Sequence, residues 1–271
     1  MNICMPYKQG FSYYDKLDEV IINYNSQDKE LINFLQENQD KKINLIINTR
    51  TFIENNDIVV FKKIQESYPQ FDFSFVFIDP KDEDTLSLIQ KLKENYIKYN
   101  YFFKFVACDW DQFLGLIELG VSEIYIGENL GFDIISVAET AKELNIKTRA
   151  YPNIAQSSWG KSKSPLKNFF IRPEDVEMYS PYIDTLEFFG KQRLETYYRI
   201  YFIDKKWDGD LKDLIIGLDQ SVPNNCILSI ENRLTCGKRC LKNNNCNICD
   251  RLVDLADSLK NNNLYVGKIQ D

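Results

Sequence analysis

The chain of 271 residues contains no histidine, and this absence narrows the chemistry available to it. Without histidine, no Ser-His-Asp or Cys-His relay can form from this chain alone, and neither can the histidine-based zinc sites of hydrolases. Proton transfer near neutral pH would therefore depend on carboxylates, Lys, Tyr, Cys or a cofactor. A site for a soft metal would depend on cysteine thiolates.

Basic residues are outnumbered by acidic ones. The chain has 33 Lys and Arg and 40 Asp and Glu, which gives a formal net charge of −7. This balance argues against an extended nucleic-acid-binding face, although it is compatible with a local basic cleft. No run approaches the ~18 apolar residues of a membrane span, and the opening MNICMPYKQG lacks the pattern of a signal peptide. We therefore expect a cytoplasmic protein without membrane association, whose cysteines are reduced or metal-bound rather than disulfide-bonded.

Short runs of β-branched and aromatic residues recur along the chain, each followed by a stretch with helical spacing. They predict eight strands, at Glu19–Tyr24, Ile43–Asn48, Phe73–Ile78, Phe102–Ala107, Glu123–Gly127, Lys147–Tyr151, Asn168–Ile171 and Thr185–Phe189. Continuous apolar runs such as Val20–Ile22 suit strands covered on both faces, as in parallel sheets. Eight βα units predict a closed (β/α)₈ barrel of the TIM type. An open doubly wound sheet is the alternative, but no GxGxxG follows any predicted strand.

The sharpest chemical signal is a group of cysteines near the C-terminus. Cys236, Cys240, Cys246 and Cys249 have the spacing C-x₃-C-x₅-C-x₂-C, with almost no apolar residues between them to bury the thiols. The sequence therefore predicts a small Cys₄ metal-binding element, residues 226–271, that packs on a barrel formed by residues 1–225. A [4Fe–4S] cluster and a Zn²⁺ ion both suit four thiolates, and local disulfides or uncoordinated thiols are the alternative without metal.

Two stretches around residues 121–205 resemble motifs of the peptidase U32 family. Gly120–Glu128 (GVSEIYIGE) is similar to its G-A-D-A-V-Y-x-G pattern. Thr185–Lys191 (TLEFFGK) falls on the K-I-E-G-R part of a later motif, and Tyr198 and Arg199 fall on a Tyr-Arg pair that follows. The acid of that motif is displaced to Glu187 or lost, and the family's C-x₆-C pair has no counterpart before it.

The resemblance implies a barrel-like catalytic domain. Several members of the family look like oxygen-independent hydroxylation factors that hold a [4Fe–4S] cluster on four cysteines. The implied function is redox modification of a small molecule or an RNA nucleoside. A homologous partner subunit is compatible with this function. Two alternatives stay open: a non-catalytic binding or scaffold barrel with a structural Zn²⁺, and a peptidase with a carboxylate- or cysteine-based mechanism.

Candidate site residues follow from the rule that barrel enzymes carry their active sites at the carboxyl ends of the strands. Asp109 and Glu128 follow predicted strands and are candidate catalytic acids or bases, since burial can raise the pKa of a carboxyl group. Glu187 joins them through the family motif. The candidate substrate-binding residues are Arg50, Asn153, Arg172, Lys191 and Arg193. Arginines can bind a carboxylate or phosphate through two hydrogen bonds, but Arg172 also precedes Pro173 in a good helix start.

Overall fold

The computed structural model describes residues 1–24, 30–39, 43–49, 55–95, 99–127, 130–131, 133–155, 169–218, 221–222, 224, 249–251, 254 and 258. Within them, one parallel sheet has the strand order β5-β4-β3-β2-β1-β9-β8-β7-β6. Its strands are β1 (Asn2–Pro6), β2 (Glu19–Tyr24), β3 (Asn44–Thr49), β4 (Asp72–Phe77), β5 (Asn100–Phe103), β6 (Val106–Ala107), β7 (Glu123–Ile126), β8 (Lys147–Ala150) and β9 (Thr185–Glu187).

The sheet curls until its two edge strands meet. β5 pairs with β4, β6 pairs with β7, and only Lys104 and Phe105 separate β5 from β6 in the chain. β5 and β6 are therefore two parts of one interrupted strand that links both edges of the sheet. The result is a nearly closed parallel barrel, which confirms the predicted α/β barrel class.

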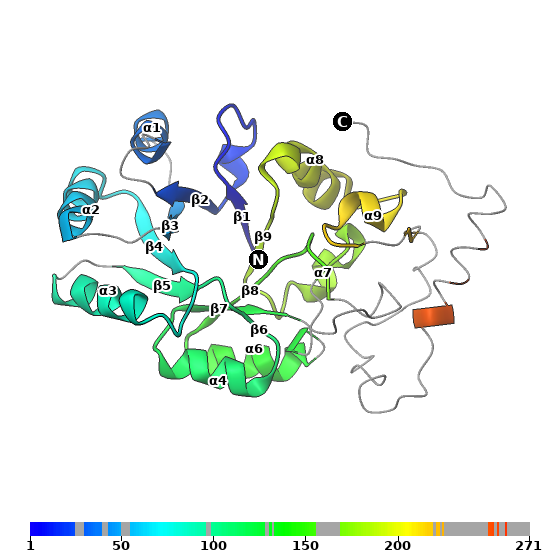
Figure 1. Ribbon diagram of the computed structural model, residues 1–271. Helices are drawn as coiled ribbons and strands as arrows, with labels where there is room; N and C mark the ends of the chain where they lie inside the picture. The colour runs from blue at the N-terminus through cyan, green and yellow to red at the C-terminus, as the bar shows by residue number, and fades with distance from the viewer. Residues whose placement is uncertain are drawn as a thin grey trace.

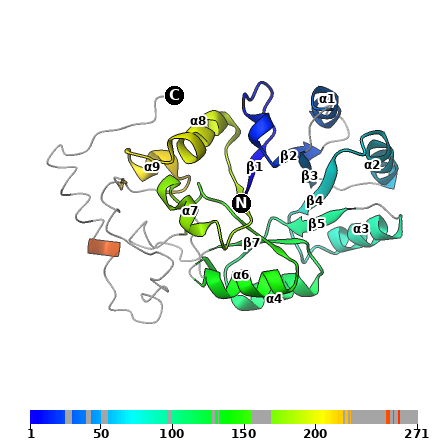
Figure 2. The ribbon, with the colours of Figure 1, turned by 180° about the vertical axis from the view of Figure 1, so that it is seen from behind.

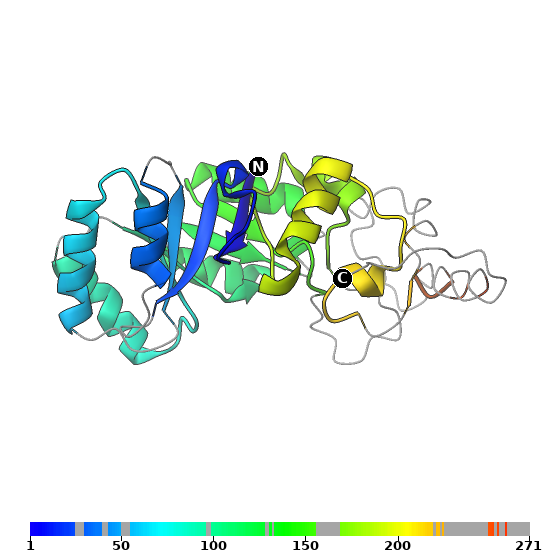
Figure 3. The same cartoon turned by 90° about the horizontal axis from the view of Figure 1, so that it is seen from above.

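Helices surround the strands on the outside of the barrel (Figure 1 and, from behind, Figure 2). They are α1 (Glu30–Glu37), α2 (Asn55–Ser67), α3 (Glu83–Glu94), α4 (Trp110–Glu118), α6 (Ile134–Glu143), α7 (Val176–Tyr179), α8 (Leu194–Tyr198) and α9 (Leu211–Leu214). Seen from above, α1, α2 and α3 lie together at one end of the molecule, and α8 lies toward the other end (Figure 3). No helix in the described part of the chain is long and apolar enough to cross a membrane.

The main core lies between the strands and the helices. The strands present Val20 and Ile22 to it, and α1 buries Leu31, Phe34 and Leu35. Side chains of a strand point alternately to opposite faces, so the second set of strand residues fills the barrel lumen. The continuous apolar runs in the sequence reflect this burial on both faces.

One predicted strand is wrong, and one real strand was not predicted. Asn168 lies outside the described residues, and the rest of the Asn168–Ile171 run contributes no strand to the sheet. The Ile171 N–H donates to the carbonyl of Pro152 at 3.0 Å, and Pro173 begins a short helix shortly afterwards. The strand that the sequence did not predict is β1, which pairs with both β2 and β9. Its sequence, NICMP, has sulfur-containing residues and a proline in place of a β-branched run, so its local pattern is weak.

Candidate active site

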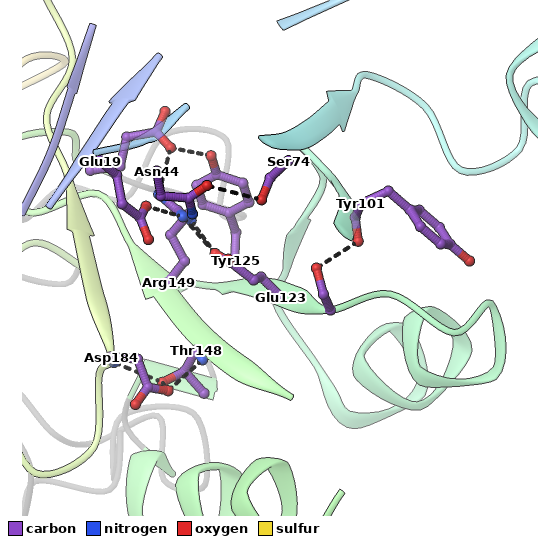
Figure 4. A network of polar contacts seen from close by, with 11 residues as sticks. Glu19, Asn44, Ser74, Tyr101, Glu123, Tyr125, Thr148, Arg149 and Asp184 are labelled. Atoms are coloured by element: carbon purple, nitrogen blue, oxygen red, sulfur yellow. Dashed lines mark hydrogen bonds and ion pairs between the residues drawn. The ribbon is translucent and has the colours of Figure 1, made fainter. Parts of the chain in front are cut away.

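A buried arginine in the barrel lumen contacts glutamates from three different strands. The side chain of Arg149, in β8, is 0% exposed, and its guanidinium contacts Glu19 of β2, Glu123 of β7 and Glu187 of β9. Its Nε lies 2.9 Å from Glu123 Oε2, and its Nη1 lies 3.4 Å from Glu187 Oε2. Figure 4 shows Glu19 and Glu123 approaching Arg149 from separate strands. The lumen thus contains an ionic cluster, which we call the lumen cluster: Arg149, Glu19, Glu123 and Glu187.

The sheet register explains why these side chains meet. Cys4 of β1 stands beside Glu19 on one neighbouring strand and beside Glu187 on the other. Arg149 stands beside Tyr125 of β7. Because residues paired across parallel strands share a face of the sheet, all of these side chains enter the lumen.

Arg149 stays charged although it is fully buried. Burial by itself would lower its pKa, but the charges of Glu123 and Glu19 outweigh burial and raise the pKa well above its usual value. The guanidinium carbon also lies 4.9 Å from the centre of the Phe102 ring and 5.7 Å from that of Tyr125, distances suited to cation–π contact. Arginine suits such a site because its guanidinium is weakly hydrated and always protonated.

The lumen cluster holds more acidic groups than Arg149 can neutralise. Burial raises the pKa of Glu123 although Arg149 opposes this effect, and the nearby charge of Glu19 raises it further. Glu19 Oε1 is buried and has no hydrogen-bond partner among the described residues. A proton retained on Glu123 would reduce the excess of negative charge in the lumen.

Glu187 is the last residue of β9 and therefore lies at the carboxyl end of that strand. Its Oε2 accepts a hydrogen bond from the Tyr125 hydroxyl and faces Arg149. Its Oε1 lies 3.8 Å from the Nζ of Lys104, whose side chain is 24% exposed. Glu187 therefore has one oxygen held within the lumen and the other directed toward a partly accessible amine.

Two tyrosines complete this end of the lumen. The ring of Tyr151 stacks on that of Tyr125, with centroids 4.8 Å apart and planes at 14°. Burial, followed by the charge of Glu187, raises the pKa of both phenols well above the usual value. Both tyrosines are therefore neutral near pH 7, and the Tyr125 hydroxyl is available as a hydrogen-bond donor.

No protein-family model matches this chain, and a comparison with curated proteins finds no match. The resemblance to the U32 family stays a prediction.

Asn153 organises the rim next to this site. Its Nδ2 donates to the carbonyl of Phe189 at 2.8 Å, and its Oδ1 accepts from the Phe189 N–H at 3.0 Å. Asn153 thus binds both backbone groups of the residue two positions after Glu187, while the Phe189 side chain is 47% exposed. Gly190 follows with φ of 98°, a left-handed conformation that suits glycine. An exposed aromatic ring is therefore presented on a restrained backbone.

The other predicted site residues within the described structure contact residues that do not belong to the lumen cluster. Asp109 caps α4 by accepting from the Gln112 N–H at 2.9 Å. Arg172 binds Asp175, Lys191 lies 3.6 Å from Glu30, and the Arg193 Nη1 donates to the carbonyl of Asp213 at 3.1 Å. Of the predicted residues, the structure brings Glu187 into the lumen cluster and places Asn153 on the neighbouring rim.

Several predicted residues lie outside the described structure: Arg50, Glu128, Cys236, Cys240 and Cys246. Cys249 is described, is partly buried and packs against the hydrophobic core. Within the described part of the chain, no group of three or more Cys, Asp or Glu side chains is arranged to hold a metal ion.

The rule of strand ends does not predict Lys104, Tyr125 or Arg149, because each lies within or between strand segments and not just past a strand end. A usable signal was present, because Glu19, Glu123 and Arg149 are charged residues inside runs predicted to be buried on both faces. Charged residues in such runs must find partners in the lumen.

Proposed function

We propose that this protein is an enzyme that transfers protons to or from a small molecule at the carboxyl end of its barrel, with Glu187 as the acid–base group. The observation that carries the proposal is the position of Glu187. It ends β9, one oxygen is held by Tyr125 and Arg149, and the other faces Lys104. In parallel barrels this end of the strands is where substrates bind.

The surrounding residues suit this role. Tyr125 and Arg149 restrict the orientation of the Glu187 carboxylate, so the group is fixed before a substrate arrives. Lys104 and Arg149 place positive charge near an anion that develops during the reaction. With no histidine in the chain, a carboxylate fixed in this way is a natural choice for general acid–base catalysis.

The test is a comparison of metabolite conversion by the wild-type chain and by Glu187→Gln. Each protein is incubated with a small-molecule extract, and compounds that change in amount are identified by mass spectrometry. Glu143→Gln is the matched control, because Glu143 is an exposed glutamate at the end of α6. We expect the wild type and the control to convert the same compounds and Glu187→Gln to leave them unchanged. Conversion by Glu187→Gln at the wild-type rate would contradict the proposal.

A second candidate function is favoured by the contact of Cys249 with the barrel core. We propose that Cys236, Cys240, Cys246 and Cys249 form a Cys₄ element within residues 226–271, held against the barrel through Cys249. With four thiolates and no histidine, a [4Fe–4S] cluster or Zn²⁺ suits the donor set. With iron, the cluster would supply electron transfer for a U32-like, hydroxylation-type modification of a small molecule or nucleoside. A cytoplasmic location, where thiols stay reduced, belongs to this proposal.

Metal analysis tests the second candidate. Protein purified without oxygen should be brown and contain about 4 Fe per chain if the element holds a cluster. Colourless protein with about one Zn per chain would contradict the redox function and support a structural zinc site. Protein without either metal would contradict the Cys₄ element itself. Cys249→Ser should lower the metal content, while Cys4→Ser, at a buried thiol in β1, is the matched control.

A further inference from the structure

We propose that Lys104 is a covalent catalytic residue that forms an imine with an aldehyde or ketone substrate in the barrel mouth. The inference deepens the proposed function and rests on it, because Glu187 would be the group that exchanges protons with the amine and with the substrate. The substrate class it assigns is that of small carbonyl compounds.

The backbone places Lys104 at the point where the interrupted strand passes from β5 to β6. Its N–H donates to the carbonyl of Phe77 at 2.6 Å, which keeps this point attached to β4. Phe102, two residues earlier, has its ring next to Arg149 in the lumen. Because side chains alternate along a strand, Lys104 enters the same lumen one step nearer the carboxyl end. The ion pair with Glu187 agrees with this direction.

The contacts of Lys104 leave its amine able to react. The distance of 3.8 Å from Nζ to Glu187 Oε1 is longer than a hydrogen bond, so the amine is close to the carboxylate without being bonded to it. Glu187 already accepts from Tyr125 and faces Arg149 through its other oxygen. With 24% of the side chain exposed, a small substrate can approach Nζ from the mouth.

The reaction needs only these groups and the substrate. Glu187 takes a proton from the Lys104 ammonium, and the nitrogen lone pair then attacks the carbonyl carbon while the C=O π electrons move to oxygen. The proton that the attacking nitrogen then loses passes to this oxygen and gives a neutral carbinolamine. Proton return from Glu187 lets the C–O bond break, so that water leaves and a C=N bond forms. In the protonated imine, the positive nitrogen withdraws electrons from the neighbouring C–H bond, whose proton Glu187 can then remove.

The alternative is that Lys104 serves only as a positive charge beside Glu187. Reductive trapping separates the two, because sodium cyanoborohydride converts an imine into a stable secondary amine. The full-length protein is incubated with pyruvate, propanal or benzaldehyde plus the reductant, and labelled lysines are identified by peptide mass spectrometry. Lys62, an exposed lysine of α2, is the internal control. We expect Lys104 to be labelled at least about tenfold faster than Lys62 with one or more probes, because oriented acid–base neighbours accelerate the addition.

The variants sharpen the result. Lys104→Arg keeps the charge but cannot form an imine, so it should lose the fast labelling, whereas Lys62→Arg should keep it. Labelling of Lys104 no faster than Lys62 with all three probes would overturn the proposal. If Lys104→Arg fails to fold by circular dichroism, the site-resolved labelling of the wild type still decides.

The two proposals can fail separately. Loss of metabolite conversion in Glu187→Gln without fast labelling of Lys104 would overturn the imine and leave the acid–base role of Glu187. Fast labelling of Lys104 together with unchanged conversion by Glu187→Gln would overturn the role of Glu187 and the imine mechanism that depends on it.

Discussion

Two buried arginines in this molecule have very different surroundings. Arg149 lies in the barrel lumen and contacts acids on three strands, of which Glu19 is 130 residues away in the chain. Arg172 lies outside the lumen and binds Asp175, three residues later, through Nε–Oδ2 and Nη2–Oδ1 hydrogen bonds of 2.7 Å each. Arg149 is thus shared among three glutamates from distant segments, whereas Arg172 forms an ion pair with the single nearby acid Asp175.

The second arginine belongs to a cluster that holds chain segments together. Arg172 Nη1 also lies 3.4 Å from Asn224 Oδ1, and Asn224 donates to Glu174 and to the carbonyl of Trp207 at 2.6 Å. These bonds tie residues near α9 to the start of α7. A charge paired one to one in this way contributes to the fold, whereas the acid-rich lumen cluster includes a carboxylate, Glu187, at the carboxyl end of its strand.

The largest expected effect is the loss of stability when an arginine is removed from the lumen cluster, compared with removal of an arginine at the surface. Arg149→Met would leave three buried carboxyl groups without their shared partner, and we expect it to lower the free energy of unfolding by about 3–5 kcal/mol. Arg199→Met is the control, because the Arg199 side chain is 64% exposed, and it should change stability by less than about 1 kcal/mol. Urea denaturation measures both. Equal stability of the two variants would show that the lumen cluster is not a unit of the fold.

The second prediction concerns the Arg172 cluster. Arg172→Met should lower the free energy of unfolding by about 3 kcal/mol, because it leaves Asp175 buried without its partner. Replacing both residues, as Arg172→Met with Asp175→Leu, should recover much of that loss. Urea denaturation of the single and double variants provides the comparison. Without recovery in the double variant, the one-to-one description of this pair would be wrong.

The third prediction is a pH dependence that originates in the lumen. The folded-state pKa of Glu123 is raised by burial, so the native protein keeps a proton that the unfolded chain loses above about pH 4.3. This stabilising contribution is complete below the unfolded pKa and is lost as pH rises through the folded pKa. Stability should therefore fall by up to about 1.4 kcal/mol per pH unit over that window.

The absence of histidine makes this dependence easier to see, because histidine is the side chain whose unperturbed pKa lies in the range between pH 5 and 8. Thermal unfolding at several pH values measures it. Glu123→Gln should flatten the curve, while Glu143→Gln, at an exposed site, should leave it unchanged. A wild-type curve that rises with pH above 5 would contradict the raised pKa.

The smallest expected effect comes from Thr185, whose position in the sheet is next to Arg149. Its hydroxyl is buried and has no hydrogen-bond partner among the described residues. Thr185→Val should therefore be neutral or stabilise the protein by up to about 1 kcal/mol, because it removes an unsatisfied polar atom. Urea denaturation measures this change. A loss of stability in Thr185→Val would contradict the prediction and would indicate that the hydroxyl binds the lumen cluster through a water molecule.

Much of the fold could be predicted from local pattern. β2 has the predicted bounds, and six further predicted strands overlap β3, β4, the β5–β6 pair, β7, β8 and β9, because apolar runs mark strands buried on both faces. β1 could not be recognised, since its place between β2 and β9 is decided by pairing with strands that are distant in the chain. The run at Phe169–Ile171 is buried as predicted, but burial alone does not make a strand.

The rule of strand ends predicted Asn153, and the resemblance to the family motif pointed to Glu187. The rule could not find Lys104, Tyr125 or Arg149, because local sequence does not reveal which distant strand supplies the partner of a charge inside a buried strand. The same rule proposed Arg172, whose described hydrogen bonds go to Asp175 and Asn224.

The most direct test of the account is the turnover number of Glu187→Gln on a compound that the wild-type protein converts. General acid–base catalysis contributes about 10²–10⁴-fold, so we predict a fall of that size with the fold intact by circular dichroism. Glu143→Gln should keep the wild-type turnover. A Glu187→Gln turnover within about twofold of the wild type would contradict the claim that the lumen cluster holds Glu187 in place for proton transfer.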